Sequence, residues 1–256
     1  MKRWIVRSFM TFALLMASIA SAYAGNKVLI AAVAERDYPP YYYTDPASGQ
    51  LKGISTEICE RLATRLGYRL EHQRFPFVRI LNNLDSGTTD IACTLFNTRQ
   101  RAPGIIFTSV PHVFEDLYVI ARSGELKQVP EHTDGIAPFA FGGVRGYYYG
   151  ERYIPNLTLF NSDEHLGPAL INRRVDLVIS NVPTFRWYAE ANEISTDAYE
   201  VIEPAWFTGA IYMGFSRSRP DAQKLAAEFT EALVEFRRTS EYRTLLAKYG
   251  LTDIHF

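Results

Sequence analysis

The chain has 256 residues, of which 27 are Lys or Arg and 28 are Asp or Glu, so its formal net charge at pH 7 is −1. Without the first 24 residues, which hold three basic side chains and no acidic ones, the charge is 24 minus 28, or −4. Because nucleic-acid binding needs a basic surface, this balance argues against a nucleic-acid partner. A small-molecule partner is compatible with it.

The N-terminus is typical of a secretory signal peptide. Three basic side chains stand within the first seven residues, and an apolar segment follows over residues 9–19. The small-x-small sequence Ala22-Tyr23-Ala24 fits a cleavage site. The apolar segment is too short to span a bilayer comfortably, although an uncleaved anchor is the alternative. We therefore expect residues 1–24 to be removed and the mature protein to be soluble and periplasmic.

The first half of the mature chain alternates between strand and helix patterns. An apolar run predicts a strand over 27–33, and an aromatic turn, ERDYPPYYY, follows it. Ser55 and Thr56 can cap a helix that Gly67 closes. The remaining predictions are a helix over 56–66, a strand over 68–74, a helix over 78–85 and a strand over 90–95. Strands separated by helices predict a largely parallel sheet.

A second pass of the same theme starts near residue 139. The segment AFGGV predicts a strand, residues 163–172 a helix, and VDLVIS at 175–180 a buried strand. Because this order echoes the first half, it indicates two similar lobes, and a chain of this size can hold both. The apolar pattern over 221–248 is typical of one or two final helices.

Arg101 follows the strand predicted over 90–95. Open α/β sheets bind ligands beyond the carboxyl ends of their strands. A guanidinium there presents a planar fork of donors that fits a carboxylate. Taken alone, however, the segment is more typical of a solvated loop arginine, since charged side chains are mostly exposed.

Cys59 and Cys93 are the only cysteines. Export makes a disulfide possible, but both residues fall on apolar segments, so we expect two buried unpaired side chains, with a disulfide as the alternative. The five His residues show no metal-ligand spacing. The sequence also lacks a nucleophile elbow, a P-loop and a dinucleotide fingerprint, so we expect no metal and no cofactor.

Several segments occur in an order that resembles a known family. They are the exported N-terminus, YPPYYY, KGISTEICERLATRLGY, LDSGTTDIACTLFNTRQR, IIFTSVPH, VDLVIS and EYRTLLAKYG, with RFPFVR and GYYYG as marks of a subgroup. Together they cover nearly all of the mature chain. The sequence is similar to the bacterial extracellular solute-binding proteins of family 3, whose best-known members bind polar amino acids.

This resemblance implies an α/β, two-lobed periplasmic binding protein fold of type II. Each lobe is a mainly parallel sheet flanked by helices, and the chain crosses between the lobes twice. Lobe 1 would hold 25–113 and 207–256, and lobe 2 would hold 114–206. A ligand would bind in the cleft and favour the hinge-closed state.

The resemblance also implies ligand contacts in lobe 1. Arg101 follows Thr98 by three residues and precedes an apolar-Phe-Thr segment, as the family's carboxylate-binding arginine does. Thr94 and Phe96 match ligand positions, although many relatives have small residues where Phe96 brings a bulky ring. Tyr38, before the Pro-Pro turn, matches an aromatic side chain that flanks the ligand.

Asn181 departs from the family pattern. Relatives commonly pair the ligand's ammonium with an acid directly after the lobe-2 strand, and Asn181 brings no charge there. Because a buried ammonium without a countercharge is costly, a standard amino-acid ligand is in doubt unless Glu35 or another acid supplies the charge. The alternative for Asn181 is a plain helix cap.

Two further side chains are candidates for the cleft. Tyr148 falls near the family's lobe-2 turn, where backbone amides and a hydroxyl often complete the carboxylate site. Arg79 would add a second cation, and a helix-surface arginine is an equally good interpretation of it.

We therefore expect a monomeric periplasmic receptor, not an enzyme, for a small carboxylate-bearing solute that it delivers to an inner-membrane ABC permease. One alternative is a sensory receptor for a membrane signalling partner. The other is a periplasmic dehydratase on the same fold, for which Glu35 and Glu151 are the candidate acid or base groups.

Overall fold

The computed structural model describes residues 27–130 and 133–251. The predicted signal peptide and its cleavage site therefore lie outside the described residues. Within the described ranges, no helix has both the length and the apolar character needed to cross a bilayer.

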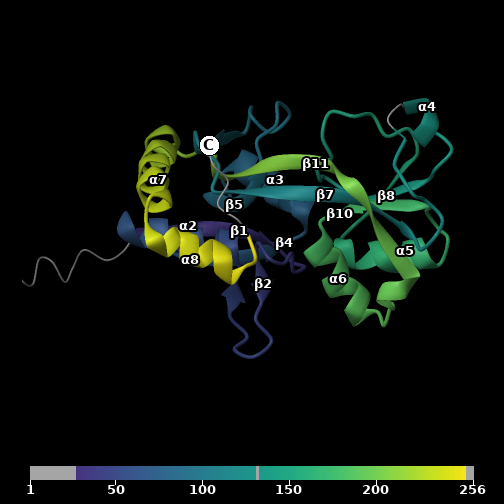
Figure 1. Ribbon diagram of the computed structural model, residues 1–256. Coiled ribbons are helices and arrows are strands. Elements are labelled where there is room, and N and C mark those ends of the chain that lie inside the picture. The colour runs from purple at the N-terminus through teal and green to yellow at the C-terminus, as the bar shows by residue number, and fades with distance from the viewer. Residues whose placement is uncertain (1–26, 131–132, 252–256) are drawn as a thin grey trace, which may run out of the picture.

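One nine-stranded sheet runs through the whole fold (Figure 1). Its order is β4-β1-β5-β11-β7-β10-β8-β9, and β6 pairs with β11. The strands are β1 (Lys27–Ala34), β4 (Tyr68–Phe75), β5 (Ile91–Phe96), β6 (Ile105–Phe107), β7 (Val113–Arg122), β8 (Phe141–Val144), β9 (Leu157–Phe160), β10 (Leu177–Ser180) and β11 (Tyr199–Ser216). A separate hairpin joins β2 (Tyr43–Thr44) to β3 (Leu51–Lys52).

The two lobes are parallel in their outer strands and antiparallel where they join. β1 pairs in parallel with β4 and β5, and β8 pairs in parallel with β9 and β10. The long strands β7 and β11 run antiparallel between these two sets, with a register shift between Ile202 and Phe207. The predicted lobe boundaries, after residues 113 and 206, fall at the start of β7 and inside β11, and they stay predictions.

The predicted helical segments occur in the predicted order, and two further helices, over 133–136 and 182–191, were not predicted. The helices are α2 (Ile54–Arg65), α3 (Phe77–Ser86), α4 (Thr133–Ile136), α5 (Leu166–Ile171), α6 (Val182–Ala191), α7 (Ala222–Arg237) and α8 (Ser240–Lys248), with 3-10 turns η1 (Asp163–His165) and η2 (Thr196–Ala198). The helix predicted over 163–172 is divided into η1 and α5. Pro168 lies in this segment and has no N–H to donate to the preceding turn, which favours the division.

Each lobe has its own hydrophobic core. Residues of α2, α7 and α8 pack with β1 and β5 in the first lobe. In the second lobe, Val178 packs with Ile120 in one cluster, while Leu177 and Ile179 belong to another. Because successive strand residues point to opposite faces, β10 is buried on both sides, as expected for a strand of a parallel α/β sheet.

Cys59 of α2 and Cys93 of β5 form a disulfide, with their Cα atoms 6.1 Å apart. Our expectation of two unpaired cysteines is therefore wrong. Both side chains are buried, as predicted, but α2 packs against β5 and brings the two sulfur atoms together. The disulfide ties this helix to the strand that carries Thr94.

Candidate functional site

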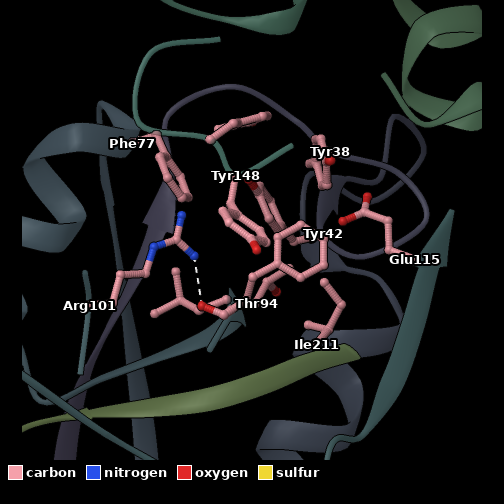
Figure 2. Close-up of a pocket in the computed structure, with 11 residues that line it drawn as sticks. Tyr38, Tyr42, Phe77, Thr94, Arg101, Glu115, Tyr148 and Ile211 are labelled. Atoms are coloured by element: carbon pink, nitrogen blue, oxygen red, sulfur yellow. Dashed lines mark hydrogen bonds between the residues drawn. The ribbon is translucent and has the colours of Figure 1, made fainter. Parts of the chain in front are cut away.

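A narrow cavity lies where the two lobes meet (Figure 2). Its free volume is ≈ 30 Å³, which is room for about one or two water molecules. Aromatic side chains fill most of the surrounding space. The lining residues are Tyr38, Tyr42, Phe77, Thr94, Leu95, Phe96, Arg101, Glu115, Tyr147, Tyr148 and Ile211.

Arg101 enters this cavity from the loop after β5, and only 9% of its surface is exposed. Its guanidinium donates to the carbonyl oxygen of Phe96 at 2.9 Å and to that of Gly146 at 3.0 Å. It also lies 5.5 Å from the centre of the Phe77 ring. Burial lowers the pKa of Arg101 to about 10, so the side chain stays protonated at neutral pH. No carboxylate pairs with it within the described residues.

Glu115 of β7 lines the same cavity and is 3% exposed. Its carboxylate accepts a hydrogen bond of 2.9 Å from Nδ2 of Asn181. Burial raises the pKa of Glu115 to about 8, and Asn181 and the Tyr38 hydroxyl oppose this rise. Figure 2 shows Arg101 and Glu115 on opposite sides of the cavity, with Tyr42 and Tyr148 drawn between them. The cavity therefore has a cationic end and an acidic end.

Glu115 was not among the residues predicted from the sequence. The signal was available: Val113, Glu115, Leu117 and Val119 alternate along one strand, and the other three are buried apolar residues. A lone acid on the buried face of a strand is unusual because burying a charge is costly.

Asp163 is a second buried carboxyl beside the cavity. It accepts a hydrogen bond of 2.8 Å from the hydroxyl of Tyr147, which lines the cavity itself. Burial raises the pKa of Asp163 to about 7. Its negative charge would also act on Glu115, whose pKa it helps to raise.

The structure brings five of the nine predicted site residues into one cavity. These are Tyr38, Thr94, Phe96, Arg101 and Tyr148. Thr98 lines a neighbouring cavity together with Arg101 and Tyr148. Their contact with a ligand stays a prediction.

Asn181 lies just behind the cavity wall. Its Oδ1 accepts a hydrogen bond of 2.8 Å from the backbone N–H of Thr184, so Asn181 is the N-cap of α6. Its Nδ2 contacts Glu115. The cap interpretation is therefore confirmed, and the same side chain also holds the buried acid.

Arg79 and Glu35 are not brought to the cavity. Arg79 is exposed on α3, because Phe77, Ile80 and Leu84 form the stripe of this helix that faces the core. Glu35 directly follows β1, and its side chain is also exposed. Neither residue is in position to supply a charge inside the site.

Direct contacts close the two lobes onto each other. The hydroxyl of Thr184 donates to the carbonyl oxygen of Pro39 at 2.8 Å, and the hydroxyl of Tyr188 donates to that of Asp37 at 2.7 Å. Both donors come from α6, and both acceptors come from the turn after β1. Together with the bond from Arg101 to Gly146, these contacts describe a closed arrangement.

Comparison with known protein families agrees with this architecture. The model of the bacterial extracellular solute-binding proteins, family 3, matches residues 30–252. The chain belongs to this family. One relative is the arginine-binding extracellular protein ArtP of Bacillus subtilis (strain 168), which is 23% identical over 252 residues, covering 94% of this chain and 88% of ArtP.

Solved structures show the same fold. An ancestral arginine-binding protein bound to arginine is 18% identical, with a TM-score of 0.73, and the likeness covers 88% of this chain and 99% of that one. A histidine kinase sensor domain with similarity to periplasmic binding proteins is 20% identical, with a TM-score of 0.75, and the likeness covers 88% and 96%. At these identities the likeness is one of fold, and it confirms the two-lobed α/β architecture predicted from the sequence.

Proposed function

We propose that this protein captures a small zwitterionic solute, an amino acid or a close relative, between its two lobes. The observation that carries the proposal is the presence of buried Arg101 and buried Glu115 in one cavity. Two carbonyl oxygens, those of Phe96 and Gly146, accept hydrogen bonds from Arg101. The carboxylate of the solute would bind the remaining N–H groups of the guanidinium. Its ammonium would face Glu115.

Glu115 removes the objection that Asn181 raised against an amino-acid ligand. A buried ammonium needs a countercharge, and in this chain the acid comes from β7 rather than from the residue after β10. The apolar wall around Glu115 disfavours its ionised form, whereas an ammonium beside it would favour that form. A bound ammonium would therefore lower the pKa of Glu115. Arginine is the first ligand to test, because the relatives are named as arginine-binding proteins.

The narrowness of the cavity supports binding by hinge motion. A volume of ≈ 30 Å³ does not admit an amino acid, so the lobes would part to admit the solute and then close over it. Secretion to the periplasm, a monomeric state and delivery to an ABC permease belong to the same proposal. They rest on membership of the solute-binding family and on the signal-peptide pattern.

The test is a thermal-shift screen of amino acids and other carboxylates, followed by calorimetry, because a ligand that binds only the native state raises its apparent stability. We expect Arg101→Ala to abolish the shift. Arg79→Ala is the matched control, since it removes an exposed arginine outside the cavity. Equal affinity of wild type and Arg101→Ala for every ligand found would refute the role of Arg101.

One observation favours a second candidate function. A buried carboxyl of raised pKa in a cleft is typical of acid or base catalysis, and Glu115 fits that description better than Glu35 or Glu151. In the dehydratase alternative, Glu115 would move a proton of a cyclic carboxylate. Turnover of such substrates, followed by absorbance, separates this activity from binding alone.

A further inference from the structure

A second and larger cavity opens on the other side of Arg101. It has a volume of ≈ 380 Å³ and lies between α3, the loop after β5 and the turn at 146–148. Arg101, Tyr147 and Tyr148 line both cavities, so these side chains form part of the wall between the two. We call the larger one the outer cavity. Its size falls within the range of about 300–1,000 Å³ that is typical of small-molecule sites.

The outer cavity is polar where the inner one is aromatic. Asn82, Asp85 and Gln100 contribute side chains to it, and all three are exposed to solvent. Within residues 27–130 and 133–251, none of them makes a side-chain hydrogen bond or ion pair. By contrast, Asp90 at the start of β5 pairs with Arg219 and also accepts from the backbone of Ile30. These carboxylate and amide groups are therefore available to a ligand in the outer cavity.

The backbone makes room for the carboxylate of Asp85. A Cβ atom at Gly104 would lie 2.1 Å from Oδ1 of Asp85, so only glycine admits the carboxylate in this position. Arg101 is the only basic residue that lines the outer cavity within the described part of the chain. A solute carboxylate bound to Arg101 would neutralise it, so exposed Asp85 would be the remaining charge in the outer cavity.

A zwitterion held by Arg101 and Glu115 needs space for its side chain. The inner cavity offers ≈ 30 Å³ between packed rings, whereas the outer cavity adjoins the same guanidinium and offers more than ten times as much. A flexible side chain of the solute that extends from the inner cavity past Arg101 would reach the polar side chains of Asn82 and Asp85 on α3. An ammonium, guanidinium or amide at its end would hydrogen-bond there, while an acidic end would be repelled by Asp85.

We propose that the outer cavity binds the side chain of the solute and that Asp85 selects an end that is cationic or donates hydrogen bonds. This inference rests on the proposed function, because it takes the solute's carboxylate to lie on Arg101. Discrimination among amino acids would then depend on residues that do not contact the carboxylate and ammonium groups that all amino acids share.

The experiment is calorimetry with L-arginine, L-lysine, L-glutamine and L-glutamate on wild type, Asp85→Asn and Glu231→Gln. Glu231 is an exposed acid on α7, so its replacement changes the net charge equally but outside the cavity. We expect wild type and Glu231→Gln to bind L-arginine or L-lysine more tightly than L-glutamine and to reject L-glutamate. Asp85→Asn should weaken binding of the cationic amino acids about fivefold, as for an ion pair that keeps some contact with solvent, and leave L-glutamine unchanged.

Each other outcome has a distinct meaning. If wild type binds amino acids in an Arg101-dependent way but Asp85→Asn binds L-arginine and L-lysine as wild type does, the inference about the outer cavity is overturned and the proposed function stands. A preference of wild type for L-glutamate has the same consequence. If no amino acid or related zwitterion binds wild type at all, the proposed function fails, and this inference fails with it.

Discussion

The side-chain amide of Asn181 donates a hydrogen bond of 2.9 Å to the carboxylate of Glu115. Asn181 is thereby fixed at the start of α6, and Glu115 is held on β7 with a partner on one oxygen. An acid that is buried on the wall of an aromatic cavity keeps its position because the amide of Asn181 donates to it. This pair is the centre of the acidic end of the site.

Replacement of Glu115 by Gln should separate the two roles of this side chain. Gln keeps the shape and a carbonyl that can accept from Asn181, but it removes the charge that would face an ammonium. We expect the affinity for a zwitterionic ligand to fall at least tenfold in calorimetry, since hydrogen bonds to charged groups contribute about 1.5–3 kcal/mol. Unchanged affinity would show that Glu115 does not face the ligand's ammonium.

The buried carboxyls also predict a pH dependence of stability. The pKa values of Glu115 and Asp163 are raised to about 8 and about 7. At a pH between the ordinary pKa of each group and its raised pKa, the folded protein therefore binds more protons than the unfolded chain. The free energy of unfolding should therefore fall as pH rises through this window. Buried His112, whose pKa is lowered to about 3, acts in the opposite direction, and this contribution is small only above about pH 7.5, where the His side chain of the unfolded chain is largely neutral.

The measurement is urea unfolding of the ligand-free protein at about pH 7.5 and pH 8.5, where the His112 side chain of the unfolded chain is largely neutral and adds little slope. We expect wild type to lose stability over this interval and Glu115→Gln to lose less. A wild-type stability that rises over the interval, or equal slopes for the two proteins, would contradict the assignment of a neutral buried Glu115.

Gly146 receives the bond from Arg101 and has a φ of 84°. A Cβ atom there would lie 3.1 Å from Cγ2 of Val78 across the interface between the lobes. Gly146→Ala should therefore weaken closure and reduce ligand affinity. Gly49→Ala is the control, because Gly49 has a φ of 66° but no atom within 4 Å of the added Cβ. Both variants should lose about 1–2 kcal/mol of stability, and only the first should lose affinity.

Tyr188 connects the lobes through its bond to the carbonyl oxygen of Asp37. Tyr188→Phe removes this donor and leaves a part-buried carbonyl with one partner fewer, so the open arrangement should gain population. Small-angle scattering of the ligand-free protein should show a larger radius of gyration. Tyr153→Phe, at a tyrosine that is 69% exposed, should leave it as in wild type. No change in Tyr188→Phe would mean that other contacts suffice for closure.

The disulfide between Cys59 and Cys93 spans 34 residues. A loop of this length restricts the unfolded chain enough to stabilise the fold by about 4 kcal/mol. We expect the Cys59→Ala, Cys93→Ala double variant to shift the urea midpoint downward, and a reductant to lower the stability of wild type but not that of the variant. A reductant effect of equal size on both proteins would argue against this bond.

The sequence by itself determined the local elements and their order. The apolar runs of β1, β5 and β10, the closing glycines after α2 and α3, and the aromatic turns all depend on residues close together in the chain. The cap predicted at Ser55 or Thr56 was wrong, because α2 begins at Ile54 and Gly53, which has no side chain to accept a bond, is its N-cap. The position of Arg101 after β5 also follows from the local sequence, and the resemblance to the family predicted that this residue binds the ligand.

Only the tertiary structure decided how distant segments meet. β7 and β11 pair across about 90 residues of chain, and no local pattern states that pairing. For the same reason no local pattern predicts that Glu115 contacts Asn181, that Cys59 bonds to Cys93, or that Arg79 and Glu35 lie outside the cavity. Local periodicity reports which face of an element is apolar, but the partners of a buried charge depend on packing between elements, and that packing exists only in the folded chain.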